Sequence, residues 1–490
     1  MGNLKKHIVL MTCLLLSALA YSQKEANNWF FGKNAGLTWN TTQELTVSGI
    51  GTTPDATLKG LPTSMSGSKI NTLEGCFSLS DSEGNLLFYS DGMTVWNKNH
   101  EPMANGKNLT GHNSSVQSGI IMPYPNATNK FIAISINQFT NNGLAYSIID
   151  MELNGGLGDV VSDYKCIPFV GGSGAIGEAV SAIPHSNGKD FWIIAPGRGT
   201  TTYMNAWLVT PDGVQVSSPR ITTLPTNISV NHNGPTGYLK FTPNGKYFVW
   251  PSHNTRQILY GEFDASQGTV LNVKQITSQE PYTYGVDFST SGKHLFISYI
   301  HSNKITIYDF SQLVKEELEV FKTIVLPSKS AGIQLGPDQR IYACAYEKNY
   351  VYVIDNPEEY DNLRAYQLPD GFMSGSCQFG LPSFSASWFL VSGDDGMCVN
   401  TPITYTMKLG GISKANYVVW NFGDGTVITE PLPSGNMTMF KEHIYKYAKN
   451  YDVTISIYDV NDVLLKETLL HTKVNRCSIP VNHNITNMKY

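Results

Sequence analysis

Short runs of alternating apolar and polar residues, separated by glycine-containing turns, recur along most of the chain. Six copies of one unit, an apolar strand followed by a polar turn and a second apolar strand, begin near residues 74, 119, 178, 236, 284 and 331. Four of the turns contain SEGN, SNGK, PNGK or TSGK, and such residues tolerate the positive φ angles of a tight hairpin. The pattern therefore predicts a series of antiparallel hairpins.

Each repeat has room for two further strands, as where KITIYDF (304–310) follows HLFISYI (294–300). Four strands in a period of this length are typical of a β-propeller blade. The segments 27–40 and roughly 376–390 remain outside the six copies, and a ring has no free edge if its last blade takes strands from both ends. We therefore predict an all-β protein with a seven-bladed propeller over 23–392; six or eight blades are the alternatives.

The pattern changes after a Gly- and Asp-rich segment at 390–400, where we place a domain boundary. Beyond it, four stretches alternate like the strands of a β-sandwich. They are ITYTMKL (403–409), NYVVWNF (416–422), YDVTISIYD (451–459) and LLKETLLHTKV (464–474). We predict an immunoglobulin-like domain over 398–476 and a short tail over 477–490.

One part of this domain resembles a known family. VVWNFGDGT (418–426), followed by EHIYKYAKNYDVTISIYD (442–459), resembles a PKD domain through its W-x-F-G-D-G hairpin and its H-x-Y. The resemblance implies that Trp420 and Phe422 enter the sandwich core. It also implies that Tyr445, two residues after His443, anchors a strand corner.

Asp424 lies between Gly423 and Gly425 in that hairpin. Both glycines are expected to adopt positive φ angles, and Asp424 is expected to accept hydrogen bonds from turn amides. The alternative is a weak calcium site formed by the acidic loops, although their spacing is not that of a calcium-binding loop. The acids concerned are Asp394, Asp395, Asp424, Asp459 and Asp462. We expect no other metal and no cofactor.

The repeat region also resembles the propeller of exported PKD-containing proteins of the Bacteroidetes, of the kind associated with gliding motility. The likeness spans nearly the whole mature chain and rests on NNWFFGKNAGL, EGCFSLSDSEGNLLFYSDGMTVWNKNH and GIQLGPDQRIYA. It implies a secreted or surface protein without an assigned reaction. Many such proteins end in a type IX secretion sorting domain, for which the segment after Cys477 is too short.

The first 22 residues join a basic start, an apolar run and small residues, which predicts a secretory signal peptide. No later stretch is long enough to cross a bilayer, so we expect a secreted or cell-surface protein. The formal charge of −5 and the absence of a basic run argue against a nucleic-acid partner. Of the seven cysteines, Cys398 and Cys477 bracket the sandwich. We predict a disulfide between them; two free thiols are the alternative.

Aromatic rings beside Asn, Thr and Gly suit a sugar or peptide surface. The candidates are Trp29, Trp96, Trp192, Tyr203, Trp207 and Tyr282. Alternatively, these rings fill the space between blades. We therefore expect an exported, non-catalytic binding or adhesion protein whose partner is an extracellular glycan or an envelope protein; a purely structural envelope component is a further option.

An enzyme at the propeller mouth, such as a polysaccharide or lactone hydrolase or lyase, is the alternative function. Its acid–base groups would come from carboxylates and imidazoles near strand ends. These residues are Glu74, Glu178, His185, His232, His253 and Asp287. Three or more of them within about 5 Å of one another would favour the enzyme.

Overall fold

The computed structural model describes residues 24–474 apart from 82, 128, 139–142, 188, 226–236, 253–255, 316–319, 386–390, 393–401, 410–414, 433–436 and 448–449. This described part is all-β. Its helical elements are the short turns η1 (Asn154–Gly156), η2 (Ser162–Tyr164) and α2 (Phe310–Val314). No described helix is long and apolar enough to cross a membrane.

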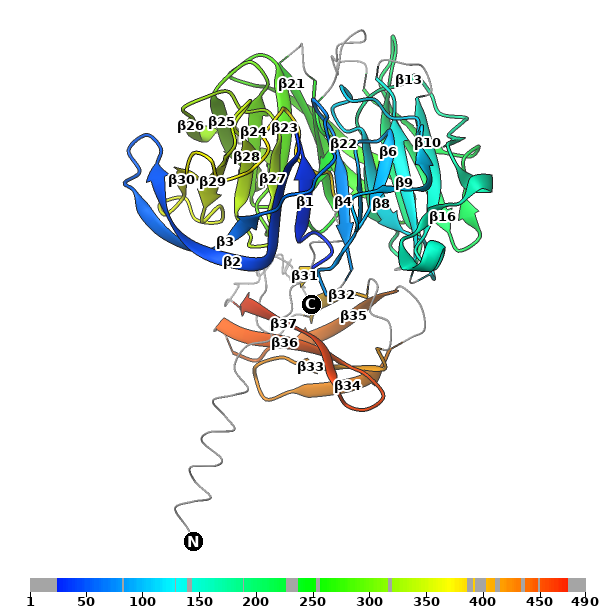
Figure 1. Cartoon of the computed structure of the whole chain (residues 1–490). Coiled ribbons are helices and arrows are strands. Elements are labelled where there is room, and N and C mark those ends of the chain that lie inside the picture. Colours follow the sequence, from blue (N-terminus) through cyan, green and yellow to red (C-terminus); the bar gives the residue numbers. More distant parts are fainter. Residues whose placement is uncertain are drawn as a thin grey trace, which may run out of the picture.

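Residues 28–367 form sheets that stand side by side around a common axis, in a near-closed, propeller-like ring (Figure 1). The described part of one sheet contains β1 (Asn28–Phe31), β2 (Ala35–Gly49), β3 (Ala56–Ser64), β27 (Ile333–Leu335), β28 (Ile341–Cys344), β29 (Val351–Asp355) and β30 (Arg364–Gln367). The next contains β4 (Phe77–Ser80), β5 (Leu86–Ser90), β6 (Thr94–Asn97), β7 (Pro102–Lys107), β8 (Gly119–Pro123), β9 (Lys130–Ile136), β10 (Leu144–Asp150), β11 (Asp159–Val160) and β12 (Ile167–Pro168).

Three further sheets complete the described ring. The first contains β13 (Ala175–Ile176), β14 (Ser181–Pro184), β15 (Phe191–Arg198), β16 (Tyr203–Thr210), β17 (Gly213–Val214) and β18 (Arg220–Thr223). The second contains β19 (Lys240–Phe241), β20 (Tyr247–Pro251), β21 (Gln257–Asp264) and β22 (Thr269–Thr277). The third contains β23 (Thr283–Phe288), β24 (His294–Tyr299), β25 (Lys304–Asp309) and β26 (Val320–Val325).

The six repeats expected from the hydrophobic pattern all form antiparallel hairpins. Their strand pairs are β4–β5, β8–β9, β14–β15, β19–β20, β23–β24 and β27–β28. These strands are buried on both faces rather than on one, as the uniform burial of β8, β23 and β24 shows. Neighbouring sheets therefore cover each other, and apolar side chains are required on both sides of a strand.

The two ends of the repeat region meet in the ring. Lys33, just after β1, exchanges two backbone hydrogen bonds with Ser376, of 2.9 and 3.0 Å. Beyond Ser376 the chain passes between the residues that precede β4 and those that precede β27. The amide of Phe379 donates to the carbonyl of Leu73, and the carbonyl of Phe379 accepts from the amide of Gly332. We call residues 376–385 the closing segment. The sequence predicted this meeting of the two ends.

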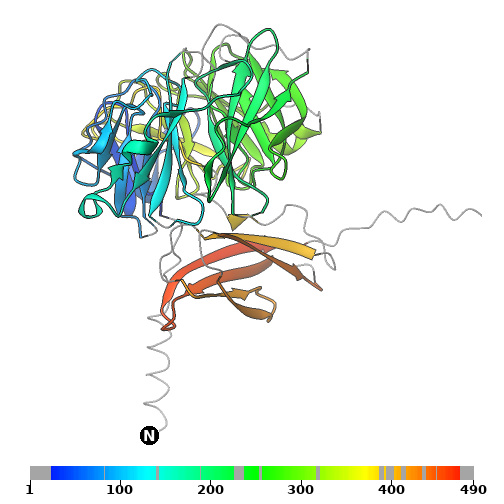
Figure 2. The ribbon, with the colours of Figure 1, turned by 90° about the vertical axis from the view of Figure 1, so that its right-hand side faces the viewer.

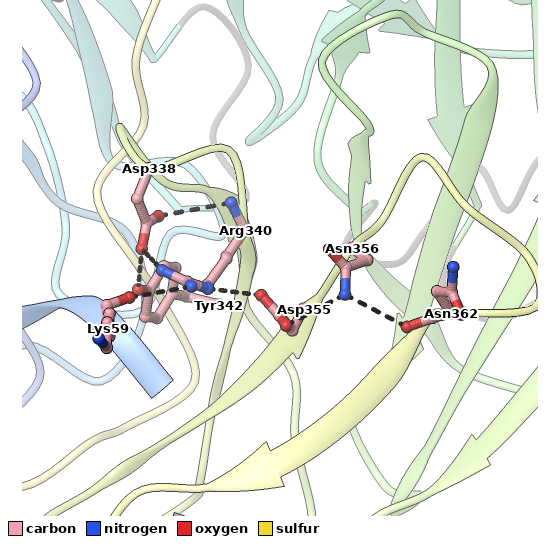
Figure 3. A network of polar contacts seen from close by, with 7 residues as sticks. All are labelled: Lys59, Asp338, Arg340, Tyr342, Asp355, Asn356 and Asn362. Atoms are coloured by element: carbon pink, nitrogen blue, oxygen red, sulfur yellow. Dashed lines mark hydrogen bonds and ion pairs between the residues drawn. The ribbon is translucent and has the colours of Figure 1, made fainter. Parts of the chain in front are cut away.

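A polar network ties β3 to the turn before β28 and to the end of β29 in the same sheet (Figure 3). Arg340 donates through Nε to Asp355 (2.7 Å), through Nη1 to Asp338 (2.9 Å) and through Nη2 to the carbonyl of Lys59 (3.1 Å). The hydroxyl of Tyr342 also donates to Asp338, at 2.6 Å. One planar guanidinium thus joins three segments, a geometry for which the donor fork of arginine is suited.

Residues 391–474 form two smaller sheets beside one end of the ring (Figures 1 and 2). One contains β31 (Val391–Ser392), β32 (Pro402–Leu409) and β35 (Met437–Ile444). The other contains β33 (Tyr417–Asn421), β34 (Val427–Pro431), β36 (Asn450–Tyr458) and β37 (Leu464–Lys473). The two sheets share one apolar core, in which Trp420 and Phe422 are fully buried, as expected.

Candidate functional site

Two acidic side chains from different repeats, Glu74 and Glu178, interact electrostatically. Glu74 precedes β4, and its Oε1 accepts a 2.9 Å hydrogen bond from the hydroxyl of Tyr284 on β23. Its Oε2 accepts from Ser114 at 3.1 Å. Burial raises the pKa of Glu74 to about 7 against the hydrogen bonds from Tyr284 and Ser114, and the charge of Glu178 adds to the increase. Glu74 therefore exchanges its proton near neutral pH.

Glu178, just before β14, is the second carboxyl of this cluster and is buried. Its Oε2 accepts a 3.0 Å hydrogen bond from the amide of Val116. Burial lowers the pKa of Arg198 and the charge of Glu178 raises it, so the two side chains interact. The carboxylates of Glu74 and Glu178 thus both bind the segment 112–117: Glu74 contacts the side chain of Ser114, and Glu178 contacts the backbone amide of Val116.

The cluster offers little access to a ligand. Glu74 is 7% exposed and Glu178 is 1% exposed. Both oxygens of Glu74 accept hydrogen bonds from the protein itself. These interactions join segments of different repeats, and they leave neither carboxylate oxygen of Glu74 free of a donor.

The other acid–base candidates do not join this pair. Asp287 instead forms a buried ion pair with Lys240, at 3.2 Å, and accepts from the amide of Leu335. His185 accepts from the amide of Asn187 and lies on the ring of Trp192. These contacts of Asp287 and His185 are all with residues other than Glu74 and Glu178. His232 and His253 lie outside the described residues.

Three of the six aromatic candidates are buried. Trp29, Trp192 and Trp207 are between 0% and 3% exposed. For these three the alternative holds, since their rings fill the space between strands, and their assignment to a ligand surface is corrected. Trp96 and Tyr203 are half-buried, with Trp96 stacked on Tyr89. Tyr282 is 39% exposed and contacts His301 edge-on.

A polar depression of about 650 Å³ lies where the two ends of the repeat region meet. Its lining residues are Lys33, Glu347, Lys348, Asn349, Asp370, Ser374, Gly375 and Ser376. They come from three places in the chain: the turn after β1, the turn between β28 and β29, and the residues that lead into the closing segment. We call this feature the closure depression. The sequence analysis missed it, because no single motif contains these residues.

The charged side chains of the closure depression are open to solvent. Lys33, Lys348 and Asp370 are exposed, and within the described ranges none of them forms an ion pair. Asn349 is partly used, since its Oδ1 accepts from the amide of Gly371 at 2.9 Å. The depression therefore presents ammonium, carboxylate and hydroxyl groups that a polar ligand can contact.

Asp424, in the smaller sheets, occupies the corner of a hairpin. Its Oδ1 accepts from the amide of Thr426 at 2.9 Å, as expected, and its Oδ2 contacts Nε2 of His443 at 2.7 Å. Gly423 and Gly425 have φ angles of 72° and 99°. The imidazole of His443 also stacks on Phe422, with ring centres 4.1 Å apart. The contact between His443 and Asp424 was not predicted, although both residues belong to the two short motifs described above, the W-x-F-G-D-G and the H-x-Y.

The other acids of the proposed calcium site are used elsewhere. Asp459 accepts from the amides of Asn461 and Val463, and Asp462 accepts from the hydroxyl of Tyr417. Asp394 and Asp395, like Cys398 and Cys477 of the predicted disulfide, lie outside the described residues. Among the residues that are described, no group of three or more His, Cys, Asp or Glu side chains is arranged to hold a metal ion.

The class of protein that these observations define is an all-β, propeller-like ring followed by two smaller sheets. No family model and no curated protein matches the chain. Among solved structures, a candidate 6-phosphogluconolactonase from Bacteroides fragilis is 12% identical, with a TM-score of 0.40 over 82% of this chain and 95% of the other. The corresponding protein from Bacteroides uniformis is 14% identical, with a TM-score of 0.37 over 76% and 98%.

A third solved structure is the extracellular domain of a candidate one-component system from Bacteroides thetaiotaomicron. It is 10% identical, with a TM-score of 0.35 over 95% of this chain and 59% of that chain. These values describe a likeness of fold and carry no information about a substrate or ligand.

Proposed function

We propose that this chain is an exported, non-catalytic binding protein that contacts a polar ligand through the closure depression. In this proposal, β1–β3 and the closing segment form a seventh blade of the ring. The two smaller sheets form a PKD-type domain that acts as a spacer or a second contact. The protein is secreted or held at the cell surface, in keeping with the signal peptide predicted over residues 1–22.

The observation that carries the proposal is the contrast between two sets of polar side chains. Glu74, Glu178 and Asp287 are buried and accept hydrogen bonds from the protein. Lys33 and Asp370, in contrast, are exposed in a depression of about 650 Å³. Small-molecule sites commonly have volumes of about 300–1,000 Å³, so the closure depression has the size that a ligand of a few sugar rings requires.

The chemistry of the lining favours a glycan over an apolar ligand. Sugars present many hydroxyl groups, which can donate to Asp370 and Glu347 and accept from Lys33 and Lys348. Ser374 can do both. An exposed loop of an envelope protein is the second partner class, because backbone amides and carbonyls match the same donors and acceptors.

A glycan array with the mature protein tests the proposal. Binding that is lost in Lys348→Ala and Asp370→Asn but kept in Lys59→Ala would support it, because the Lys59 side chain is 81% exposed and lies outside the depression. The absence of any glycan hit, together with turnover of a chromogenic glycoside or lactone, would replace the proposal by the enzyme alternative.

A further inference from the structure

Three buried cysteines lie in or beside the closing segment. Cys76, Cys344 and Cys377 are each 0% exposed and present as free thiols. Cys377 belongs to the closing segment itself, Cys344 ends β28, and Cys76 directly precedes β4. Cys76 also forms an isolated parallel bridge with Pro382. The position at which the ring closes is therefore also the position at which thiols gather.

Cys344 and Cys377 face the same small region. The thiol of Cys344 donates to the carbonyl of Gly380 at 3.3 Å, and the thiol of Cys377 donates to the carbonyl of Tyr350 at 3.1 Å. Tyr350 immediately precedes Val351, the cross-strand partner of Cys344. The thiol of Cys344 thus contacts the closing segment three residues after Cys377, and the thiol of Cys377 contacts the residue before the cross-strand partner of Cys344. The neighbouring Cys377 also raises the pKa of Cys344.

The backbone around the two cysteines is already held in register. The amide of Cys377 donates to the carbonyl of Lys348 at 2.7 Å, and its carbonyl accepts from the amide of Glu347 at 3.1 Å. On the other side, the amide of Cys344 donates to Gly332, whose own amide donates to Phe379. Hydrogen bonds on both flanks therefore hold the main chain of the two cysteines in place.

We propose that Cys344 and Cys377 form a disulfide in the exported protein, and that this bond joins the closing segment to the sheet of β28. The two thiols lose two protons and two electrons, and one S–S bond forms. The electrons reduce the disulfide of an external thiol–disulfide oxidant, which leaves as two thiols. Compartments outside the cytoplasm supply oxidants of this class.

The bond forms before the closing segment is fully buried. The thiolate is the reacting form of cysteine, and burial raises the pKa of Cys344 well above its ordinary value, with a further increase from the neighbouring Cys377. In the closed ring both thiols are buried and out of reach of an oxidant. Oxidation therefore belongs to folding, when the closing segment first reaches β28.

The two cysteines of the proposed disulfide are close in sequence to residues that line the closure depression. Ser374 to Ser376 precede Cys377, and Glu347 to Asn349 lie between Cys344 and Tyr350, so the bond joins two walls of the depression. Holding both walls in one arrangement reduces the ordering cost of binding. This second consequence rests on the proposed binding of a ligand, whereas the disulfide rests only on the proposed export of the protein.

Peptide mapping of the full-length exported protein tests the bond. The protein is alkylated under denaturing conditions without reductant and digested, and the peptides are identified by mass spectrometry. We expect a linked pair that contains Cys344 and Cys377 and is two hydrogen atoms lighter than the two free peptides. Complete alkylation of both cysteines, or a link from Cys76 to either of them, would overturn the proposal.

Two variants separate the bond from its effect on binding. Reduction is expected to lower the urea midpoint of the wild type and of Cys76→Ala by more than that of the double variant Cys344→Ala/Cys377→Ala, in which only the bond predicted between Cys398 and Cys477 is left to reduce. If the double variant does not fold, the peptide map still decides. If a glycan binds on the array, reduction of the disulfide should weaken glycan binding several-fold. If the peptide map shows the disulfide but its reduction leaves the affinity unchanged, only the proposed effect on the depression is refuted. A chain that binds no glycan but carries the bond would refute the proposed function and leave the disulfide standing.

Discussion

The hydroxyl of Tyr284 donates a 2.9 Å hydrogen bond to Oε1 of Glu74, across 210 positions of the sequence. Both side chains are buried, and they belong to the fifth and the first of the six repeats. The contact forms only when the strands between them have assembled into a ring. The same contact opposes the effect of burial on the pKa of Glu74.

Glu74→Gln should remove a pH-dependent loss of stability. In the unfolded chain Glu74 ionises near its ordinary pKa of 4.5, whereas the folded protein keeps the proton up to about pH 7. Its stabilising contribution is therefore complete below pH 4.5 and is lost as the pH rises through 7. The difference between these values corresponds to roughly 3 kcal/mol. Urea unfolding of both proteins from pH 4.5 to 8 should show the variant gaining up to that amount relative to the wild type.

Tyr284→Phe is the matched control for this prediction. The hydrogen bond from Tyr284 opposes the effect of burial on the pKa of Glu74, so its removal should move the transition to higher pH. A stability difference between Glu74→Gln and the wild type that stays constant over the whole range would show that Glu74 does not titrate in this way.

Removal of one partner of the buried pair Lys240 and Asp287 should be costly. The two side chains are each 9% exposed, and Nζ of Lys240 also donates to Gln334 at 2.6 Å. Lys240→Met leaves a buried carboxylate without its cation, which typically costs about 3–5 kcal/mol. The double variant Lys240→Met/Asp287→Asn should cost less than the sum of the two single variants, by about 1 kcal/mol or more. Additive costs in a double-mutant cycle by urea unfolding would contradict this coupling.

Gly380→Ala should open the ring at the closing segment. A Cβ at this position would collide with the carbonyl oxygen of Glu74, and neither backbone can move without breaking the hydrogen bonds of Phe379. We expect a loss of roughly 1–3 kcal/mol, as for an overpacked core. Gly199→Ala is the control, because its nearest neighbour would be Thr201 at 3.5 Å, an ordinary contact. Equal urea midpoints for the two variants would count against this account of the closing segment.

Asp424→Asn should change the stability of the smaller sheets at acidic pH. Burial alone would raise the pKa of Asp424, but hydrogen bonds from His443 and Thr426 outweigh it and lower the pKa below 3.8. The stabilisation is thus present above pH 3.8 and lost as the pH falls through the lower folded value. Hydrogen exchange of peptide 417–429, measured by mass spectrometry, should show faster exchange in the variant at pH 6 and a smaller difference at pH 3. A difference that persists unchanged at pH 3 would assign the effect to packing.

Local patterns were sufficient for the parts of the fold that depend on neighbouring residues. Alternation and turn residues predicted six hairpins, and all six are present. The W-x-F-G-D-G sequence predicted the buried Trp420 and Phe422 and the positive φ angles on both sides of Asp424. Each of these features is determined within a few residues of the chain, by side-chain periodicity and by backbone sterics.

The aromatic candidates show where this reasoning stops. Trp29 and Trp207 have polar neighbours in sequence, yet both are fully buried. Periodicity indicates that two faces of a strand differ, but neighbouring sheets of the ring cover both faces. The sequence therefore could not distinguish an aromatic side chain that fills the core from one that contacts a ligand.

The sequence by itself determined the all-β class, the repeated hairpins and the meeting of the two ends of the repeat region. Only the tertiary structure decided that Glu74 lies beside Glu178 and not beside Asp287, and that Lys33, Lys348 and Asp370 share one depression. The physical reason is that distances between residues far apart in the chain depend on how the sheets pack around the axis. Pattern and propensity act over a few residues and leave that packing open.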